Sequence, residues 1–232
     1  MQTRQICGLE HRLSLRCIQH RDVIWLTMMS IMLFILLLPI SSYIAVLPFI
    51  REELELSNTQ AGIHFSATLV GYVLCSLLIV PLTDRISSKH ILIGAGILST
   101  VSHILFPIFS GSISNAIFLR ILCGIGFAGI YVPGSRIIST HFSGGGRGTA
   151  LGLFVTAQYL ANSVSLIITG AAMIAFEWRH AYLLVSIISI AGLPLAYTLL
   201  RRDKNNLHTQ SSGKLNFRVL KNSPVRYLIA GY

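Results

Sequence analysis

A single arginine, Arg120, interrupts the apolar run 116–135. An arginine at membrane depth costs about 2.5–3.5 kcal/mol, so it usually faces protein or a water-filled cavity. By the helix rise it lies about 7 Å into this run, and the alternative is a side chain that extends to the nearby membrane interface. No Asp or Glu lies inside any long apolar run, so no carboxylate is predicted to neutralise the charge. Arg120 therefore predicts a binding site for an anionic or strongly polar solute.

A polar stripe follows one face of a second apolar run, 149–174. Its members are four, three and four residues apart, which places them on one side of a helix: Gln158, Asn162, Ser165 and Thr169. Such side chains either line a hydrated cavity or form hydrogen bonds with neighbouring helices. Gln158 and Asn162 lie nearest the middle of the run and are the predicted solute contacts.

Two tyrosines and two histidines are further polar groups inside apolar runs. Tyr43 and Tyr72 are candidate solute contacts. His64 and His103 could titrate near neutral pH. The favoured interpretation is that each is a hydrogen-bonded or interfacial histidine.

The elements that position these residues are six long apolar runs. The chain has 232 residues, of which 53% are hydrophobic and only 11% charged, whereas about a quarter of residues are charged in soluble domains. The runs are continuously apolar over about the 20 residues that a helix needs to cross a bilayer, and they lack the alternation of barrel strands. We therefore predict an all-α membrane protein, a bundle of six transmembrane helices over 24–50, 59–83, 91–109, 116–135, 149–174 and 181–200.

The basic residues indicate the orientation of this bundle. Fifteen of the eighteen Lys and Arg residues fall on one side when alternate loops are counted together, and that side is expected to be cytoplasmic. Both termini are therefore predicted to be cytoplasmic, in a multi-pass protein of the inner or plasma membrane. The net charge of +10 lies at the ends of apolar runs rather than in a separate basic domain, so nucleic acid is not a predicted partner.

No signature of an enzyme or of a metal or cofactor site is present. The four cysteines have neither metal-site spacing nor a paired framework. The glycine run 144–146 lacks the Lys-Ser/Thr of a phosphate-binding loop. We expect no catalytic residues, no metal and no cofactor.

Four short motifs, in this order and spacing, resemble the major facilitator superfamily of secondary transporters. They are an Arg-x-x-x-Gly-x-Gly pattern, a loop with an Asp-Arg pair and a lysine, a glycine-containing loop that begins with an arginine, and a Trp-Arg pair. The residues are Arg120, Gly124, Gly126, Asp84, Arg85, Lys89, Arg147, Trp178 and Arg179. The Asp-Arg loop departs from the family signature, since Val80 and Ser87 stand at glycine positions and Ser88 replaces a basic residue.

The resemblance implies one six-helix half of that fold and transport by alternating access. It implies that Asp84, Arg85 and Lys89 form a charge cluster at the cytoplasmic gate. Conformational roles are implied for Gly124, Gly126 and Arg147, on the same basis. Arg120, Gln158 and Asn162 would contact a small solute, with a proton or counter-ion as a possible coupling ion.

The expected organisation is a cytoplasmic segment 1–23, the bundle 24–200, a cytoplasmic linker 201–223 and the start of a truncated seventh helix at 224–232. The expected partners are the lipid bilayer, a small-molecule solute, and a missing C-terminal half or a second copy. The alternative is a non-transporting six-helix membrane protein, or a half-transporter, that acts only by association with another subunit.

Overall fold

The apolar runs form helices because backbone groups inside a bilayer can be satisfied only by hydrogen bonds within the segment or a closed barrel. The computed structural model describes residues 20–83, 86–142, 144 and 146–202. It contains six helical segments that are long and apolar enough to cross a membrane, which confirms the predicted number and fold class. The helices are α2 (His20–Glu53), α3 (Asn58–Leu82), α4 (Ser88–Phe109), α5 (Ile113–His141), α6 (Gly146–Ala175), α7 (Trp178–Ile188), η1 (Ser189–Ala191) and α8 (Gly192–Arg202).

The observed spans begin before the predicted apolar runs because polar residues cap and continue the helices. At the start of α3 the Ser57 hydroxyl accepts a hydrogen bond from the Gln60 amide at 3.2 Å, and the Ser57 amide donates to the Gln60 side chain at 2.9 Å. This reciprocal pair is a capping box, which satisfies two backbone donors at a helix start. Residues 20–23 belong to α2 and residues 201–202 to α8. The rest of the predicted tail, linker and seventh-helix segments lies outside the described residues.

The sixth span is built from three consecutive pieces rather than one regular helix. It comprises α7, the 3₁₀ turn η1 and α8, and the prediction of a single uniform span did not include this break. Pro194 explains it, because a proline has no amide hydrogen with which to bond the carbonyl four residues earlier. A short 3₁₀ turn tightens the chain where that bond is absent.

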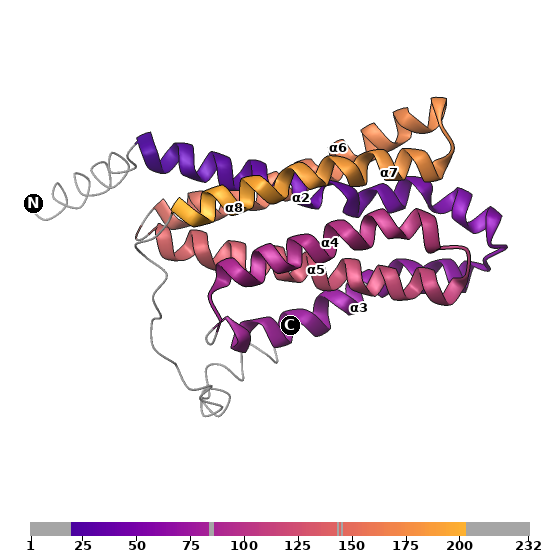
Figure 1. Ribbon diagram of the computed structural model, residues 1–232, viewed down its shortest axis with the longest axis horizontal. Helices are drawn as coiled ribbons and strands as arrows, with labels where there is room; N and C mark the ends of the chain where they lie inside the picture. Colours follow the sequence, from indigo (N-terminus) through magenta and orange to yellow (C-terminus); the bar gives the residue numbers. More distant parts are fainter. Residues whose placement is uncertain (1–19, 84–85, 143, 145, 203–232) are drawn as a thin grey trace, which may run out of the picture.

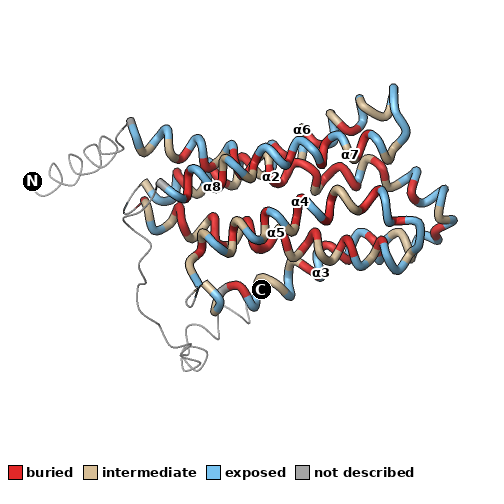
Figure 2. Tube along the Cα trace, in the orientation of Figure 1, coloured by how far each residue is buried: buried red, intermediate tan, exposed pale blue. Residues whose placement is uncertain are grey.

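Helix α5 occupies the centre of one side of the bundle, between α3 and α4, and α2 packs along α6 (Figure 1). The α7–α8 span lies against α2 and α4. Figure 2 shows most buried positions along α2, α4 and α5. In contrast, α3 and α6 carry large apolar side chains that are mostly exposed, including Leu77, Leu78, Ile167 and Ile174. These two helices present faces suited to lipid or to further protein.

The two ends of the bundle differ in which connections they hold. The α2–α3, α4–α5 and α6–α7 connections lie at one end, which we call the Glu53 end. A small core near this end joins Tyr43, Phe106, Leu119 and Tyr182. A larger core extends toward the opposite end and includes Met32, Ile137 and Phe154.

Candidate functional site

Arg120 is buried inside the bundle. It lies two turns into α5, and only 2% of its surface is exposed. Its guanidinium carbon is 3.7 Å from the centre of the Tyr43 ring on α2, a distance typical of a cation–π contact. The side chain therefore points toward protein, and the alternative of a side chain that extends to the interface does not describe it.

Groups on four other helices lie near enough to this guanidinium to be affected by its charge. The charge of Arg120 acts on Tyr43 of α2, His64 of α3, His103 of α4 and Tyr182 of α7. We call these four residues and Arg120 the Arg120 cluster. Each lies four to ten residues from the Glu53 end of its helix, or about 6–15 Å by the helix rise. The similar depth explains why residues from all five helices meet.

Aromatic rings connect the cluster on the side of α4 and α7. The Tyr43 ring meets Phe106 edge-on at 5.7 Å, and Phe106 lies 5.3 Å from the Tyr182 ring. His103 stacks on Tyr182 at 6.3 Å with an interplanar angle of 19°. These ring contacts pack the polar side chains of the cluster against one another and against Phe106.

The polar atoms of the cluster are mostly unpaired. Within the part of the chain that the structure describes, buried atoms without a hydrogen-bond partner include Nε and Nη1 of Arg120, the hydroxyls of Tyr43 and Tyr182, both ring nitrogens of His64 and Nε2 of His103. The Tyr182 hydroxyl lies close to Arg120 but without hydrogen-bond geometry. A buried polar group without a partner costs about 1–3 kcal/mol. Such a concentration of unpaired groups is typical of a ligand site.

The unpaired atoms can mostly donate hydrogen bonds. A guanidinium has only donors, and the two hydroxyls and the His64 ring can each donate one bond. No ion pair of Arg120 with a carboxylate is found among the described residues. The arrangement is therefore suited to a ligand rich in acceptor oxygens, such as a carboxylate or a sulfonate.

The two histidines were not predicted as members of this cluster. The favoured interpretation, a hydrogen-bonded or interfacial histidine, is wrong for His64, which is fully buried with both nitrogens unpaired. It is half right for His103, whose Nδ1 lies 2.7 Å from the Ser99 carbonyl oxygen while Nε2 is unpaired. Tyr182 was not predicted as a member of the Arg120 cluster. Its one signal in the sequence is its position four residues after Trp178, which gives it a depth in the span similar to that of Arg120.

The polar stripe on α6 divides into two parts. Ser165 and Thr169 are buried and each lies 2.9 Å from the Ser42 hydroxyl on α2, so this part forms hydrogen bonds between helices. Gln158 and Asn162 are half-buried near the middle of α6. By helix position they lie farther from the Glu53 end than Arg120 does.

Tyr72 lies apart from the Arg120 cluster, since its ring packs on Phe127 of α5 at 4.7 Å. Of the two predicted tyrosines, therefore, only Tyr43 contacts Arg120.

Gly124 and Gly126 allow α5 to approach two neighbours closely. A Cβ atom added to Gly124 would meet the backbone of Thr68 and Tyr72 on α3, whereas one added to Gly126 would lie 2.6 Å from the Ser99 Cβ on α4. Both contacts are too close for a side chain. The two glycines thus set the spacing of α5 against α3 and α4.

The predicted gate residues that the structure describes, Lys89 and Arg147, lie toward the end opposite Glu53. Asp84 and Arg85 lie outside the described residues. Lys89 is half-buried in the first turn of α4, and Arg147 is exposed in the first turn of α6. A hydrogen bond from Arg136 to the Thr83 hydroxyl joins α5 to the end of α3.

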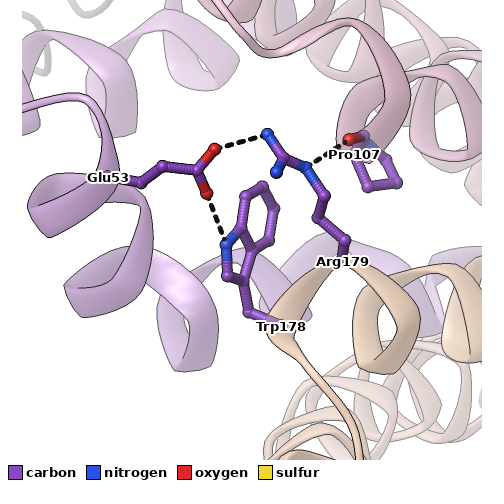
Figure 3. A network of polar contacts seen from close by, with 4 residues as sticks. All are labelled: Glu53, Pro107, Trp178 and Arg179. Atoms are coloured by element: carbon purple, nitrogen blue, oxygen red, sulfur yellow. Dashed lines mark hydrogen bonds and ion pairs between the residues drawn. The ribbon is translucent and has the colours of Figure 1, made fainter.

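A polar network joins three helices at the Glu53 end (Figure 3). The Glu53 carboxylate accepts from Arg179 Nη2 at 2.6 Å and from Trp178 Nε1 at 2.8 Å. Arg179 Nε also donates to the Pro107 carbonyl at 3.1 Å. These bonds tie the ends of α2 and α4 to the start of α7. An open pocket of about 530 Å³ lies beside the network.

Comparisons with known proteins agree with this architecture. Residues 29–232 match the Major Facilitator Superfamily. The hexuronate transporter of Bacillus subtilis is 28% identical over 149 residues, which are 62% of this chain and 34% of that protein. The probable sulfoacetate transporter SauU of Cupriavidus necator is 26% identical over 185 residues, which are 80% of this chain and 43% of that protein. The chain thus spans about a third to two fifths of the length of these relatives.

Among solved structures, the fold resembles a bacterial homologue of the human lysosomal transporter Spinster in its inward-facing and unoccupied conformation. The TM-score is 0.68 at 16% sequence identity, and the match covers 86% of this chain and 47% of that chain. At this identity the likeness concerns the fold alone.

Proposed function

Because this chain belongs to the major facilitator superfamily and is a multi-pass membrane protein, we propose that it forms the N-terminal six-helix half of a secondary transporter for a small organic anion. Its family is one of transporters and not of enzymes. The observation that carries the proposal is the buried, unneutralised Arg120, whose Nε and Nη1 atoms have no partner among the described residues.

The chemistry of the Arg120 cluster supports an anion over a neutral or cationic solute. Charge-assisted hydrogen bonds from a guanidinium to a carboxylate are about twice as strong as neutral ones. An anion there would satisfy Arg120 together with the hydroxyls of Tyr43 and Tyr182. The names of the two relatives, a hexuronate and a probable sulfoacetate transporter, are consistent with an acidic solute.

Transport proceeds, in this proposal, by rocking of two six-helix halves around a shared site. The exposed apolar faces of α3 and α6 support contact with a second half, supplied by a C-terminal bundle or a second copy. Gln158, Asn162 and Tyr72 contact the solute as it passes the middle of the bundle. A coupling ion accompanies it.

Residues at the end opposite Glu53 form the gate. Asp84, Arg85 and Lys89 form its charge cluster, and Arg147 steadies one conformation. Gly124 and Gly126 keep α5 close to its neighbours as the halves move. The distribution of Lys and Arg supports a Glu53 end that faces outward and chain termini that face the cytoplasm.

Uptake of labelled solutes into vesicles that hold the complete gene product tests the proposal. The panel includes a hexuronate, sulfoacetate, a neutral hexose and an organic cation. We expect uptake of at least one anion, and a loss of roughly 10- to 150-fold in Arg120→Gln, since hydrogen bonds to a charged group contribute about 1.5–3 kcal/mol.

Two further variants sharpen this test. Arg120→Lys keeps the charge but loses the planar group over Tyr43, so an intermediate loss is expected. Arg201→Gln removes an exposed charge on α8 and should leave uptake unchanged. Uptake of the hexose or the cation that ignores Arg120→Gln, with no anion transported, contradicts the proposal.

A further inference from the structure

His103 holds one ring nitrogen in a defined state. It lies on α4, about two turns from the Glu53 end, and is fully buried. Its Nδ1 atom is 2.7 Å from the Ser99 carbonyl oxygen. A carbonyl oxygen only accepts hydrogen bonds, so Nδ1 carries the hydrogen and, in the neutral ring, Nε2 keeps its lone pair. Nε2 has no hydrogen-bond partner among the described residues.

Four helices, α2, α5, α7 and α8, pack against α4, where His103 lies. Among the residues that the structure describes, Arg120 of α5 is the charged group that acts on His103, and the buried thiol of Cys123 lies on the same helix as Arg120. Tyr182 of α7 stacks on its ring, and Tyr43 of α2 lies on the far side of Phe106. Helix α8 contributes no charged residue before Arg201.

Nε2 of His103 differs from the other unpaired atoms in one respect. The two nitrogens of Arg120 can only donate, and the tyrosine hydroxyls can donate as well as accept. His64 has one donor and one acceptor nitrogen, but no hydrogen bond among the described residues fixes which is which. Nε2 of His103 can only accept in the neutral ring. All eight acidic residues of the chain lie in tails, in turns or at helix ends, so no carboxylate inside a span competes for a proton here.

Charge balance couples a proton on Nε2 to an anion at Arg120. The empty cluster already carries the positive charge of Arg120, which opposes a second positive charge on the imidazole. Burial of the ring opposes that charge more strongly still. A bound anion offsets both effects, because it neutralises Arg120 and attracts the imidazolium. By thermodynamic reciprocity, a proton on His103 then strengthens anion binding by the same factor.

We propose that Nε2 of His103 binds a proton when an organic anion occupies the Arg120 cluster, so that proton and anion are held together. The proton comes from hydronium or from the acid group of the solute. Its O–H bond breaks as the N–H bond forms, and the neutral imidazole becomes an imidazolium. One anionic and one positive charge enter together, and no oxidation or reduction takes place. This inference rests on the anion site proposed above.

Calorimetry of anion binding to the purified complete gene product measures the proton directly. Titrations in two buffers of different ionisation enthalpy give the number of protons taken up per anion. Near pH 5.5, about one unit below the usual histidine pKa of 6.5, a ring restored to that pKa is about nine-tenths protonated. We therefore expect the wild type to take up close to one proton more per anion than His103→Asn. Asparagine can still donate to the Ser99 carbonyl but has no atom that binds a proton.

Matched variants separate this role from a structural one. His180→Asn changes an exposed histidine at the same end of the bundle and should keep the proton uptake of the wild type. His64→Asn changes the other buried histidine of the Arg120 cluster and tests whether the proton binds there instead. His103→Asn should still bind the anion through Arg120, which also reports that it is folded. His103→Gln repeats the measurement if the first variant does not purify.

The outcomes distinguish the two proposals. Full proton uptake by His103→Asn, or its loss in His64→Asn alone, overturns the assignment to His103 and leaves the anion site standing. Anion binding that is unchanged in Arg120→Gln overturns the anion site, and the proton site falls with it.

Discussion

The close contact of Gly124 with α3 yields a prediction whose size follows from the structure. An alanine Cβ at this position would meet the Thr68 carbonyl oxygen and lie 2.9 Å from the Tyr72 amide nitrogen. Both atoms belong to the α3 backbone, so no change of side-chain rotamer relieves the contact. Helix α3 must move away from α5, which is its principal packing partner.

The expected magnitude comes from a pair of variants. Forcing an extra methyl group into a well-packed contact costs about 1–3 kcal/mol, while replacing a helical glycine with alanine contributes up to about 1 kcal/mol in helix propensity. Gly62 is also helical, on α3, and nothing lies within 4 Å of an added Cβ there. The propensity gain is common to both variants and cancels. Gly124→Ala should therefore be less stable than Gly62→Ala by about 1–3 kcal/mol.

Reversible unfolding in mixed detergent micelles, followed by circular dichroism, measures the free energy of unfolding of both variants and the wild type. Gly62→Ala should be as stable as the wild type or slightly more stable. Equal stability of Gly124→Ala and Gly62→Ala would refute the argument that α3 and α5 meet backbone to backbone at Gly124.

Two other substitutions test contacts between helices in the same unfolding assay. Glu53→Gln removes the ion pair with Arg179, and because both side chains are more than a third exposed, we expect a loss of only about 0.5–1 kcal/mol that shrinks in 1 M salt. Glu52→Gln, an exposed neighbour, should change nothing, and an equal effect of both variants contradicts a specific contact. Ser42→Ala removes both hydrogen bonds to α6 and should cost about 1 kcal/mol, since such bonds in membrane proteins average about 0.6 kcal/mol each. Ser163→Ala, whose hydroxyl bonds only its own helix, should cost less, and the reverse order would contradict the assignment.

The number and approximate limits of the spans could be predicted from the sequence because apolar length alone decides which segments cross a bilayer. Gly124 and Gly126 could also be recognised, because their spacing after Arg120 resembles the family motif. The 3₁₀ turn at 189–191 could not be predicted, although Pro194, which explains it, is visible in the sequence. A proline near a helix start usually fits without a break, so the presence of Pro194 did not by itself indicate an interrupted span.

The orientation of each helix about its axis was much harder to predict. A lipid-facing side chain is as apolar as a buried one, so the spans lack the one-sided pattern that marks the inner face of a soluble helix. His64, His103 and Tyr182 were therefore not assembled with Arg120 in advance. The α6 stripe was visible because it is polar, yet only the packing against Ser42 shows that Ser165 and Thr169 bind a neighbouring helix.

The energetics of Arg120 link the fold to the proposed solute. Placing an arginine within the bilayer costs about 2.5–3.5 kcal/mol, and a desolvated cation–π contact such as that with Tyr43 returns about 2 kcal/mol. The contact places the guanidinium carbon over the Tyr43 ring, while Nε and Nη1 have no partner among the described residues. An acceptor that bonds these two nitrogens recovers the rest while the contact with Tyr43 is kept. The ring thus holds the guanidinium in a binding orientation before the solute arrives, which lowers the conformational entropy lost on binding.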